Sequence, residues 1–118
     1  MPTATDLLLW GIVVHLVCDW LLQNHWMATF KTDLRHPAAW VHSGIHFAGL
    51  CLVFPVGAAA VLFLSHLLID TRKPLHWWRD LIHQTADPQN PATIHVAFWR
   101  DQVAHILCLA IAALVCGR

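Results

Sequence analysis

Four pairs of histidine or aspartate residues interrupt the apolar segments of this chain, and in each pair the two residues are four positions apart. The pairs are His15 with Asp19, His42 with His46, His66 with Asp70, and Asp101 with His105. Residues four apart lie one above the other on a single face of a helix. Ionisable groups in an apolar helix are tolerated only where they face a bundle interior or a water-filled cavity. The pairs therefore predict four helices whose polar faces meet at one site.

The composition predicts that lipid surrounds this bundle. The chain is 58 % hydrophobic and 12 % charged, whereas an ordinary soluble domain is roughly 45–50 % apolar and about 25 % charged. A domain of this size has much surface relative to its core, and in water it would need more polar residues. We therefore expect one integral membrane domain, residues 1–118, with the lipid bilayer as its partner. The net charge is zero with neutral histidines, and no basic patch indicates a nucleic-acid partner.

The four cysteines stand singly in apolar runs, without a Cys-x-x-Cys motif. They indicate neither a disulfide framework nor a thiolate zinc site, and we interpret them as small packing residues. No basic segment and no small-residue cleavage site precede Leu7, so we expect the first apolar segment to be a retained span and not a signal peptide.

The expected fold is an all-α, four-helix transmembrane bundle with up-down topology. Its spans are predicted at about residues 7–29, 38–54, 56–73 and 94–116, and Thr5 and Asp6 are the expected N-cap of the first. Residues 75–84 fit a short interfacial helix between the third and fourth helices, or alternatively the end of a loop. The apolar stretches are only about 14–17 residues long and reach the roughly 20 residues of a span by including their polar turns.

Up-down topology places all four pairs in the same half of the membrane. At about 1.5 Å per residue, His15 lies roughly 12 Å into its helix from Leu7, and His66 roughly 13 Å into its helix from Gly57. The cations on that side are Lys31, Arg35, Arg72, Lys73, Arg79 and Arg100, and only Arg118 is on the other. By the positive-inside rule, the site and the longer loops are cytoplasmic and both termini are outside.

The eight paired residues, five imidazoles and three carboxylates, form a candidate metal site. Such a set suits zinc, manganese or iron, and facing helices of four-helix bundles hold two-metal sites in other proteins. Two ions, or one ion with aspartates that orient histidines, both fit the number of candidate ligands. Gln23 and Gln102 are interpreted as hydrogen-bond partners of the ligands. The remaining histidines considered, His36, His76, His83 and His95, lie in expected loops or helix ends and are interpreted as solvated.

The leading functional hypothesis is a metal-dependent hydrolase of a membrane-associated, anionic substrate, such as a lipid. A bound cation activates water, and one of Asp19, Asp70 or Asp101 would act as the catalytic base. Lys31, Arg72 and Lys73 would bind an anionic head group at the cytoplasmic rim; alternatively, these cations serve only topology and lipid contact. One alternative is a non-enzymatic metal or proton carrier; another is a structural protein whose polar pairs only clamp the helices. The oligomeric state is left open.

Several of these elements together resemble one family. They are His15-x-x-x-Asp19-Trp20-x-x-Gln23, Lys31, His42, His46, His66-x-x-x-Asp70-x-x-Lys73 and Asp101-Gln102-x-x-His105. The pattern is similar to the domain of unknown function 3307 family of small prokaryotic membrane proteins, over nearly the whole chain. The resemblance implies an integral membrane protein and supplies no activity. The chain is also loosely similar to His/Asp-rich, membrane-bound metal-dependent hydrolases. This similarity is an analogy only and does not establish a shared activity.

Overall fold

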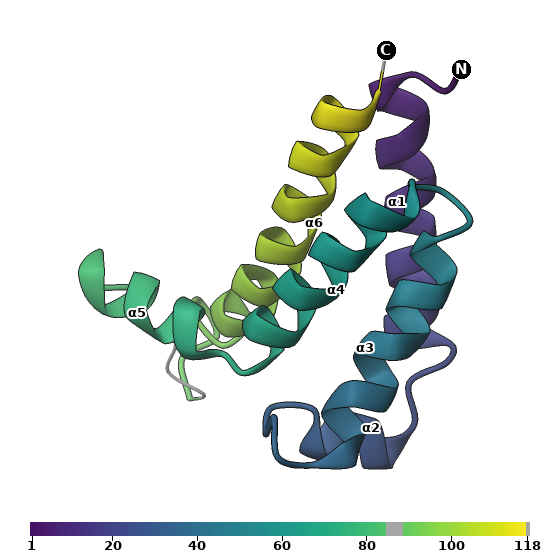
Figure 1. The fold of residues 1–118 in the computed structure, drawn as a ribbon. Helices are drawn as coiled ribbons and strands as arrows, with labels where there is room; N and C mark the ends of the chain where they lie inside the picture. Colours follow the sequence, from purple (N-terminus) through teal and green to yellow (C-terminus); the bar gives the residue numbers. More distant parts are fainter. Residues whose placement is uncertain (85–88, 118) are drawn as a thin grey trace.

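The chain folds into helices and connecting loops (Figure 1). A computed structural model describes residues 1–84 and 89–117, and within them there are six helices and no strands. The helices are α1 (Ala4–Trp20), α2 (His25–Phe30), α3 (Pro37–Leu50), α4 (Val56–Asp70), α5 (Lys73–Leu81) and α6 (Val96–Cys116). The predicted all-α fold is confirmed.

Four of these helices form a bundle. Both α1 and α4 pack against α3 and α6, so the helices close into a ring in the order α1, α3, α4, α6. The short α2 packs against α3, and α5 extends sideways from the end of α4 (Figure 1). The two chain ends lie together at the end of the bundle remote from α2 and α5, where Gly117 approaches the backbone of Ala4 closely enough that a Cβ would clash.

The prediction of one helix over residues 7–29 is wrong, because the chain forms two. The first begins earlier: Thr3 is its N-cap and forms a reciprocal capping box with Asp6, in place of the expected cap at Thr5 and Asp6. It ends at Trp20. Asn24 then starts α2, because its side-chain oxygen accepts a hydrogen bond from the Met27 N–H at 2.9 Å, and an asparagine satisfies orphan N–H groups better at a cap than within a helix.

The other helix ends also differ from the prediction. The third predicted helix, residues 56–73, stops at Asp70 because Arg72 takes a left-handed conformation with φ of 64° and Pro74 belongs to the first turn of α5. The second ends at Leu50, four residues early, where the chain turns toward Pro55. Of the two alternatives for residues 75–84, the helix is found, as α5 from Lys73 to Leu81.

Among the described residues, α6 alone is long and apolar enough to cross a membrane, and α4 is a shorter apolar helix. A bundle of four spans is therefore not confirmed. Two of the bundle helices are shorter than a membrane span because they end early. Helix α1 has 17 residues and α3 has 14, whereas a span needs about 20.

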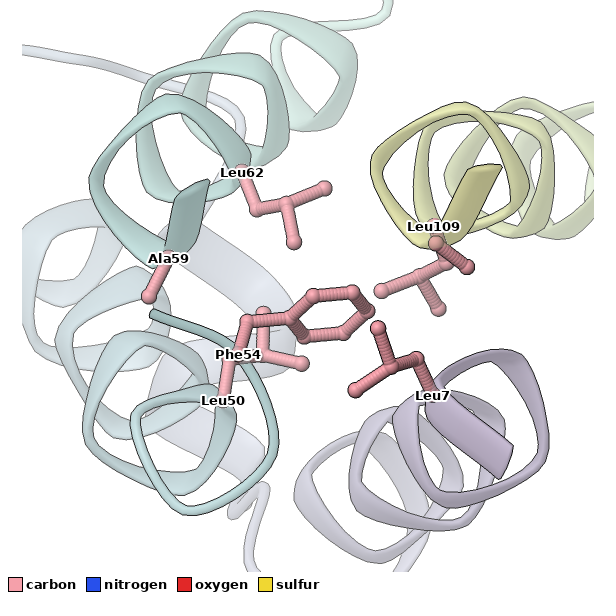
Figure 2. Packing of buried hydrophobic residues seen from close by; sticks show 7 residues of the cluster. Leu7, Leu50, Phe54, Ala59, Leu62 and Leu109 are labelled. Carbon is pink, nitrogen blue, oxygen red and sulfur yellow. The ribbon is translucent and has the colours of Figure 1, made fainter. Parts of the chain in front are cut away.

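An apolar core fills the half of the bundle nearer the chain ends. Figure 2 shows Leu7 of α1, Leu62 of α4 and Leu109 of α6 converging on the ring of Phe54, which lies in the turn after α3. These side chains are at most 4 % exposed. The core makes this half of the bundle interior apolar and confines the polar cluster to the other half.

The outer surface of the bundle is strongly apolar. Trp10, Leu64 and Leu107 are 59 %, 57 % and 59 % exposed, whereas His42 and His46 inside are 0 % and 1 % exposed. Large exposed apolar surfaces are rare on soluble monomers and mark interaction with a membrane or a protein.

Candidate metal centre

All four bundle helices contribute polar side chains to one interior cluster. His15 and Asp19 come from α1, His42 and His46 from α3, His66 and Asp70 from α4, and Asp101 and His105 from α6. Seven of the eight are buried, and Asp101 is partly exposed. The four-residue spacing places each pair on the inner face of its helix, so the eight paired residues meet in one interior cluster.

Six of these residues form two groups in which the potential ligand atoms lie within 4.8 Å of one another. One group contains Asp19, His42, His46 and His66, and the other contains His66, Asp70 and His105. His66 belongs to both. The cluster could therefore hold one ion or two.

The first aspartate of the cluster, Asp19, faces the histidines of α3. Its Oδ1 lies 2.9 Å from His46 Nε2 and 3.2 Å from His42 Nε2. His42 Nε2 is also 3.4 Å from Asp70 Oδ2, so this ring lies between the two carboxylates.

The second aspartate, Asp70, faces histidines of α4 and α6. Its Oδ2 lies 2.9 Å from His66 Nε2, and its Oδ1 lies 3.3 Å from His105 Nε2. The rings also crowd one another: the centroid of His66 is 4.0 Å from that of His46 and 4.5 Å from that of His105.

Many of these short approaches are not hydrogen bonds. Nε2 of His42, His66 and His105 and both carboxylate oxygens of Asp70 are buried and have no partner in hydrogen-bond geometry among the described residues. Buried polar atoms are normally satisfied. Metal–ligand bonds of about 2.0–2.2 Å hold neighbouring ligand atoms roughly 3–3.5 Å apart. The observed spacing suits donor atoms that share a cation.

The tautomer of His105 supports the same interpretation. Its Nδ1 lies 2.8 Å from the backbone carbonyl oxygen of Asp101, which can only accept, so Nδ1 carries a proton. In the neutral ring, Nε2 then has a lone pair that faces Asp70 Oδ1 at 3.3 Å. Two acceptors at this distance repel unless a metal ion, or a proton on Nε2, lies between them. A backbone carbonyl on the far nitrogen is a usual support of a metal-bound histidine.

Gln102 connects the two ligand groups to His15 and Asp101, the two paired residues that lie outside these groups. Its Oε1 accepts from His15 Nε2 at 3.1 Å, and its Nε2 donates to Asp101 Oδ2 at 3.2 Å and, more weakly, to Asp19 Oδ2 at 3.4 Å. His15 and Asp101 belong to neither ligand group. Their place is beside the centre, where Gln102 holds them. The other predicted hydrogen-bond partner, Gln23, follows the end of α1, and its buried Oε1 has no partner among the described residues.

A cavity of about 620 Å³ opens beside the centre. Its lining includes Asp19, Asp101 and Gln102 together with the cations Lys31, Arg72 and Arg100. Of the predicted head-group residues, Lys31 and Arg72 thus lie at this cavity, whereas Lys73 is exposed at the start of α5 and does not line it. His76, predicted to be solvated, is exposed but also contributes to the lining.

A second, much smaller cavity lies on the side of the centre toward the apolar core. This cavity of about 20 Å³ is lined by His15, His46, His66 and His105 together with apolar side chains, among them Leu50, Leu62 and Leu109 of the core. This volume is about that of one water or small ion. The centre thus has a wide approach from the 620 Å³ cavity and an apolar floor.

The fold and the site define an all-α bundle protein with a buried His/Asp cluster that could hold a metal ion. The chain belongs to the family described as protein of unknown function (DUF3307), whose model matches residues 7–117. This confirms the resemblance that the sequence motifs indicate. No curated protein and no solved structure matches the chain.

Proposed function

We propose that this chain is a membrane-embedded, metal-dependent hydrolase that acts on a membrane-associated anionic substrate. The site would contain zinc, manganese or iron at the buried cluster. The observation that carries the proposal is the set of buried Nε2 and Oδ atoms that face one another at 2.9–3.4 Å without hydrogen-bond geometry.

The membrane location is supported by a polar interior and an apolar outer surface, which is the reverse of the arrangement in a soluble protein. The bundle interior contains the histidines and aspartates, and the outward faces of α1, α4 and α6 carry large apolar side chains. Short helices are compatible with a bilayer that thins locally or with flanking residues that extend to the interface. The cations around α2 and α5 are consistent with a cytoplasmic site and with both termini outside.

The metal would be held by the two groups that share His66. Asp19, His42 and His46 complete one group, and Asp70 and His105 complete the other. When bound, the cation lowers the pKa of a water ligand and stabilises negative charge on a phosphoryl or carbonyl oxygen.

Asp101 is the best placed general base. It lies outside both ligand groups, lines the 620 Å³ cavity and is oriented by Gln102 Nε2 at 3.2 Å. In the proposed reaction, Asp101 takes a proton from the attacking water, and the water oxygen bonds to the phosphoryl or carbonyl centre. The bond from that centre to the ester oxygen breaks, and the leaving alkoxide receives the proton that Asp101 took up. Asp19 and Asp70 would act through the metal.

A carrier is less well supported than a hydrolase. A relay across a membrane requires polar groups on both sides of the cluster. On the side toward the chain ends the interior is filled by Leu7, Phe54, Leu62 and Leu109. A purely structural clamp would be expected to form hydrogen bonds, whereas both oxygens of Asp70 have none with the described residues.

The test is elemental analysis of detergent-purified protein. Wild type is compared with a His66→Ala variant and with the matched control His25→Ala, which removes an exposed histidine of α2. We expect roughly one or two metal ions per chain in wild type and control, and a loss in His66→Ala while circular dichroism shows a folded protein. Absence of metal in wild type, even after zinc, manganese and iron are added back, would refute the metalloenzyme.

A further inference from the structure

The 620 Å³ cavity combines two kinds of lining that a single ligand could use. Three cations, Lys31, Arg72 and Arg100, meet there from three parts of the chain. The cavity also has an apolar wall of Trp20, Leu75, Ile94, Ala97 and Phe98. We propose that this cavity binds a phosphate monoester, with Arg100 as its principal anchor and an apolar chain along the wall. The inference deepens the proposed function by naming the chemistry of its substrate.

Arg100 supplies the most specific observation. Its Nε donates to Gln84 Oε1 at 2.7 Å, which fixes the direction of the guanidinium group. Its Nη2 is buried and has no hydrogen-bond partner among the described residues. A buried donor of a charged group without a partner is costly. A guanidinium group presents a planar fork of donors that matches the oxygens of a phosphate, so a bound phosphate would satisfy Nη2.

The charges around the cavity favour an anion of high charge. Within the described part of the chain, Lys31, Arg72 and Arg100 form no ion pair, so none of them is neutralised by a contacting carboxylate. The lining also contains two carboxylates, Asp19 and Asp101, so the three cations exceed the acidic groups by one. Asp19 faces His42 and His46. A phosphate monoester has three terminal oxygens and nearly two negative charges at neutral pH, and these complement three separate cations.

The conformation of Arg72 is consistent with this role. It is a non-glycine residue in the left-handed region, with φ of 64° and ψ of −3°, between α4 and α5. Such strain is maintained where surrounding structure determines it, and it concentrates at ligand sites. Here it places the Arg72 side chain at the cavity.

The apolar wall specifies the rest of the ligand. Trp20 of α1 and Phe98 of α6 meet edge to face with ring centroids 5.6 Å apart. Trp20 is 61 % exposed, so this wall continues onto the apolar outer surface of the bundle. A lipid phosphate could place its phosphate among the cations and its chains along these rings, whereas a soluble ester would use the cations alone.

Calorimetric titration of metal-loaded protein in detergent tests the proposal. The probes are dihexanoyl phosphatidate, dihexanoyl phosphatidylcholine with the same chains but a zwitterionic head, and glycerol 3-phosphate without chains. We expect phosphatidate to bind at least tenfold more tightly than phosphatidylcholine. Arg100→Gln should weaken phosphatidate binding at least tenfold, Arg100→Lys less, and the control Arg79→Gln less than twofold, because Arg79 pairs with Asp80 outside the cavity.

The outcomes separate the ligand sources and the two proposals. Tighter binding of phosphatidate than glycerol 3-phosphate identifies a lipid and supports the whole proposal. Equal binding identifies a soluble ester, which supports the anion site and refutes the role of the apolar wall. Equal binding of phosphatidate and phosphatidylcholine overturns it, as does unchanged affinity in folded Arg100→Gln and Lys31→Gln variants of unaltered metal content. Phosphatidate binding by a protein that contains no metal and hydrolyses no ester supports the anion site and refutes the proposed function.

Discussion

Replacement of Gln102 by methionine tests whether the hydrogen bonds around the cluster orient metal ligands. The substitution nearly conserves side-chain volume and removes both ends of the amide. It thereby deletes the contacts to His15 at 3.1 Å, to Asp101 at 3.2 Å and to Asp19 at 3.4 Å. His15 Nε2 keeps one partner, Asp19 Oδ2 at 3.3 Å. The main loss is therefore in the orientation of the Asp19 and Asp101 carboxylates.

The expected size of the effect follows from these contacts. Loss of a hydrogen-bond partner of a metal ligand typically weakens metal affinity by about 10–100-fold, which corresponds to about 1.4–2.7 kcal/mol. The contact from Gln102 to Asp19 is long, at 3.4 Å. Because long hydrogen bonds are weak, we expect the lower part of this range.

The assay is a competition titration of zinc against a chromogenic chelator in detergent, with circular dichroism to establish folding. The matched control is Gln23→Met, because Gln23 belongs to neither ligand group and its Oε1 has no hydrogen-bond partner among the described residues. Its zinc affinity should stay within threefold of wild type. If folded Gln102→Met binds zinc as tightly as Gln23→Met, the amide does not orient the ligands and the reasoning fails.

Three further predictions concern catalysis, binding and packing. Asp101→Asn should retain its metal by elemental analysis but lose about 10²–10⁴-fold in ester hydrolysis; parallel loss of metal would instead make Asp101 a ligand. Arg72→Gly should leave the free energy of chemical unfolding unchanged or raise it by up to about 1 kcal/mol, since glycine accepts φ of 64°, yet weaken phosphatidate binding; a loss of stability would contradict the strain argument. Gly49→Ala should lower the free energy of unfolding by about 1–3 kcal/mol, because the new Cβ would lie 2.7 Å from Val14 Cγ1. Gly44→Ala should raise it by about 0.5–1 kcal/mol, because nothing lies within 4 Å of the new Cβ. Equal midpoints for these two variants in denaturant would refute the close packing of α1 on α3.

The sequence predicted the assembly of the polar cluster well because a helix has a fixed period. His66 and Asp70 must share a face if the segment is helical, and the apolar surroundings require that face to point inward. The sequence does not indicate which of these side chains lie close enough together to bind the same ion. His15 and Asp101 occupy pairs like the others, but their positions beside Gln102 depend on how the helices rotate and cross.

The ends of helices and the role of Arg100 were harder to predict. The apolar run past Trp20 favoured continuation, whereas Asn24 offered a competing start for α2 through a single side-chain hydrogen bond. Arg100 stands next to Asp101 in the sequence, and its position there indicates only a topological role. Its contact with Gln84, 16 positions earlier, is tertiary, and no local pattern encodes it.

Gly117 lies against the backbone of Ala4, so the beginning of α1 and the end of α6 are close in space. A short linker could join these ends, and new ends could be opened in the turn at Pro55, between α3 and α4. Such a circular permutant would follow the order α4, α5, α6, α1, α2, α3 with every pair of neighbouring helices retained. Because the histidines and aspartates come from all four bundle helices and from none of the connections, their convergence depends on which helices are neighbours and not on the order of synthesis. A permutant that folds and contains the wild-type amount of metal would demonstrate this independence directly.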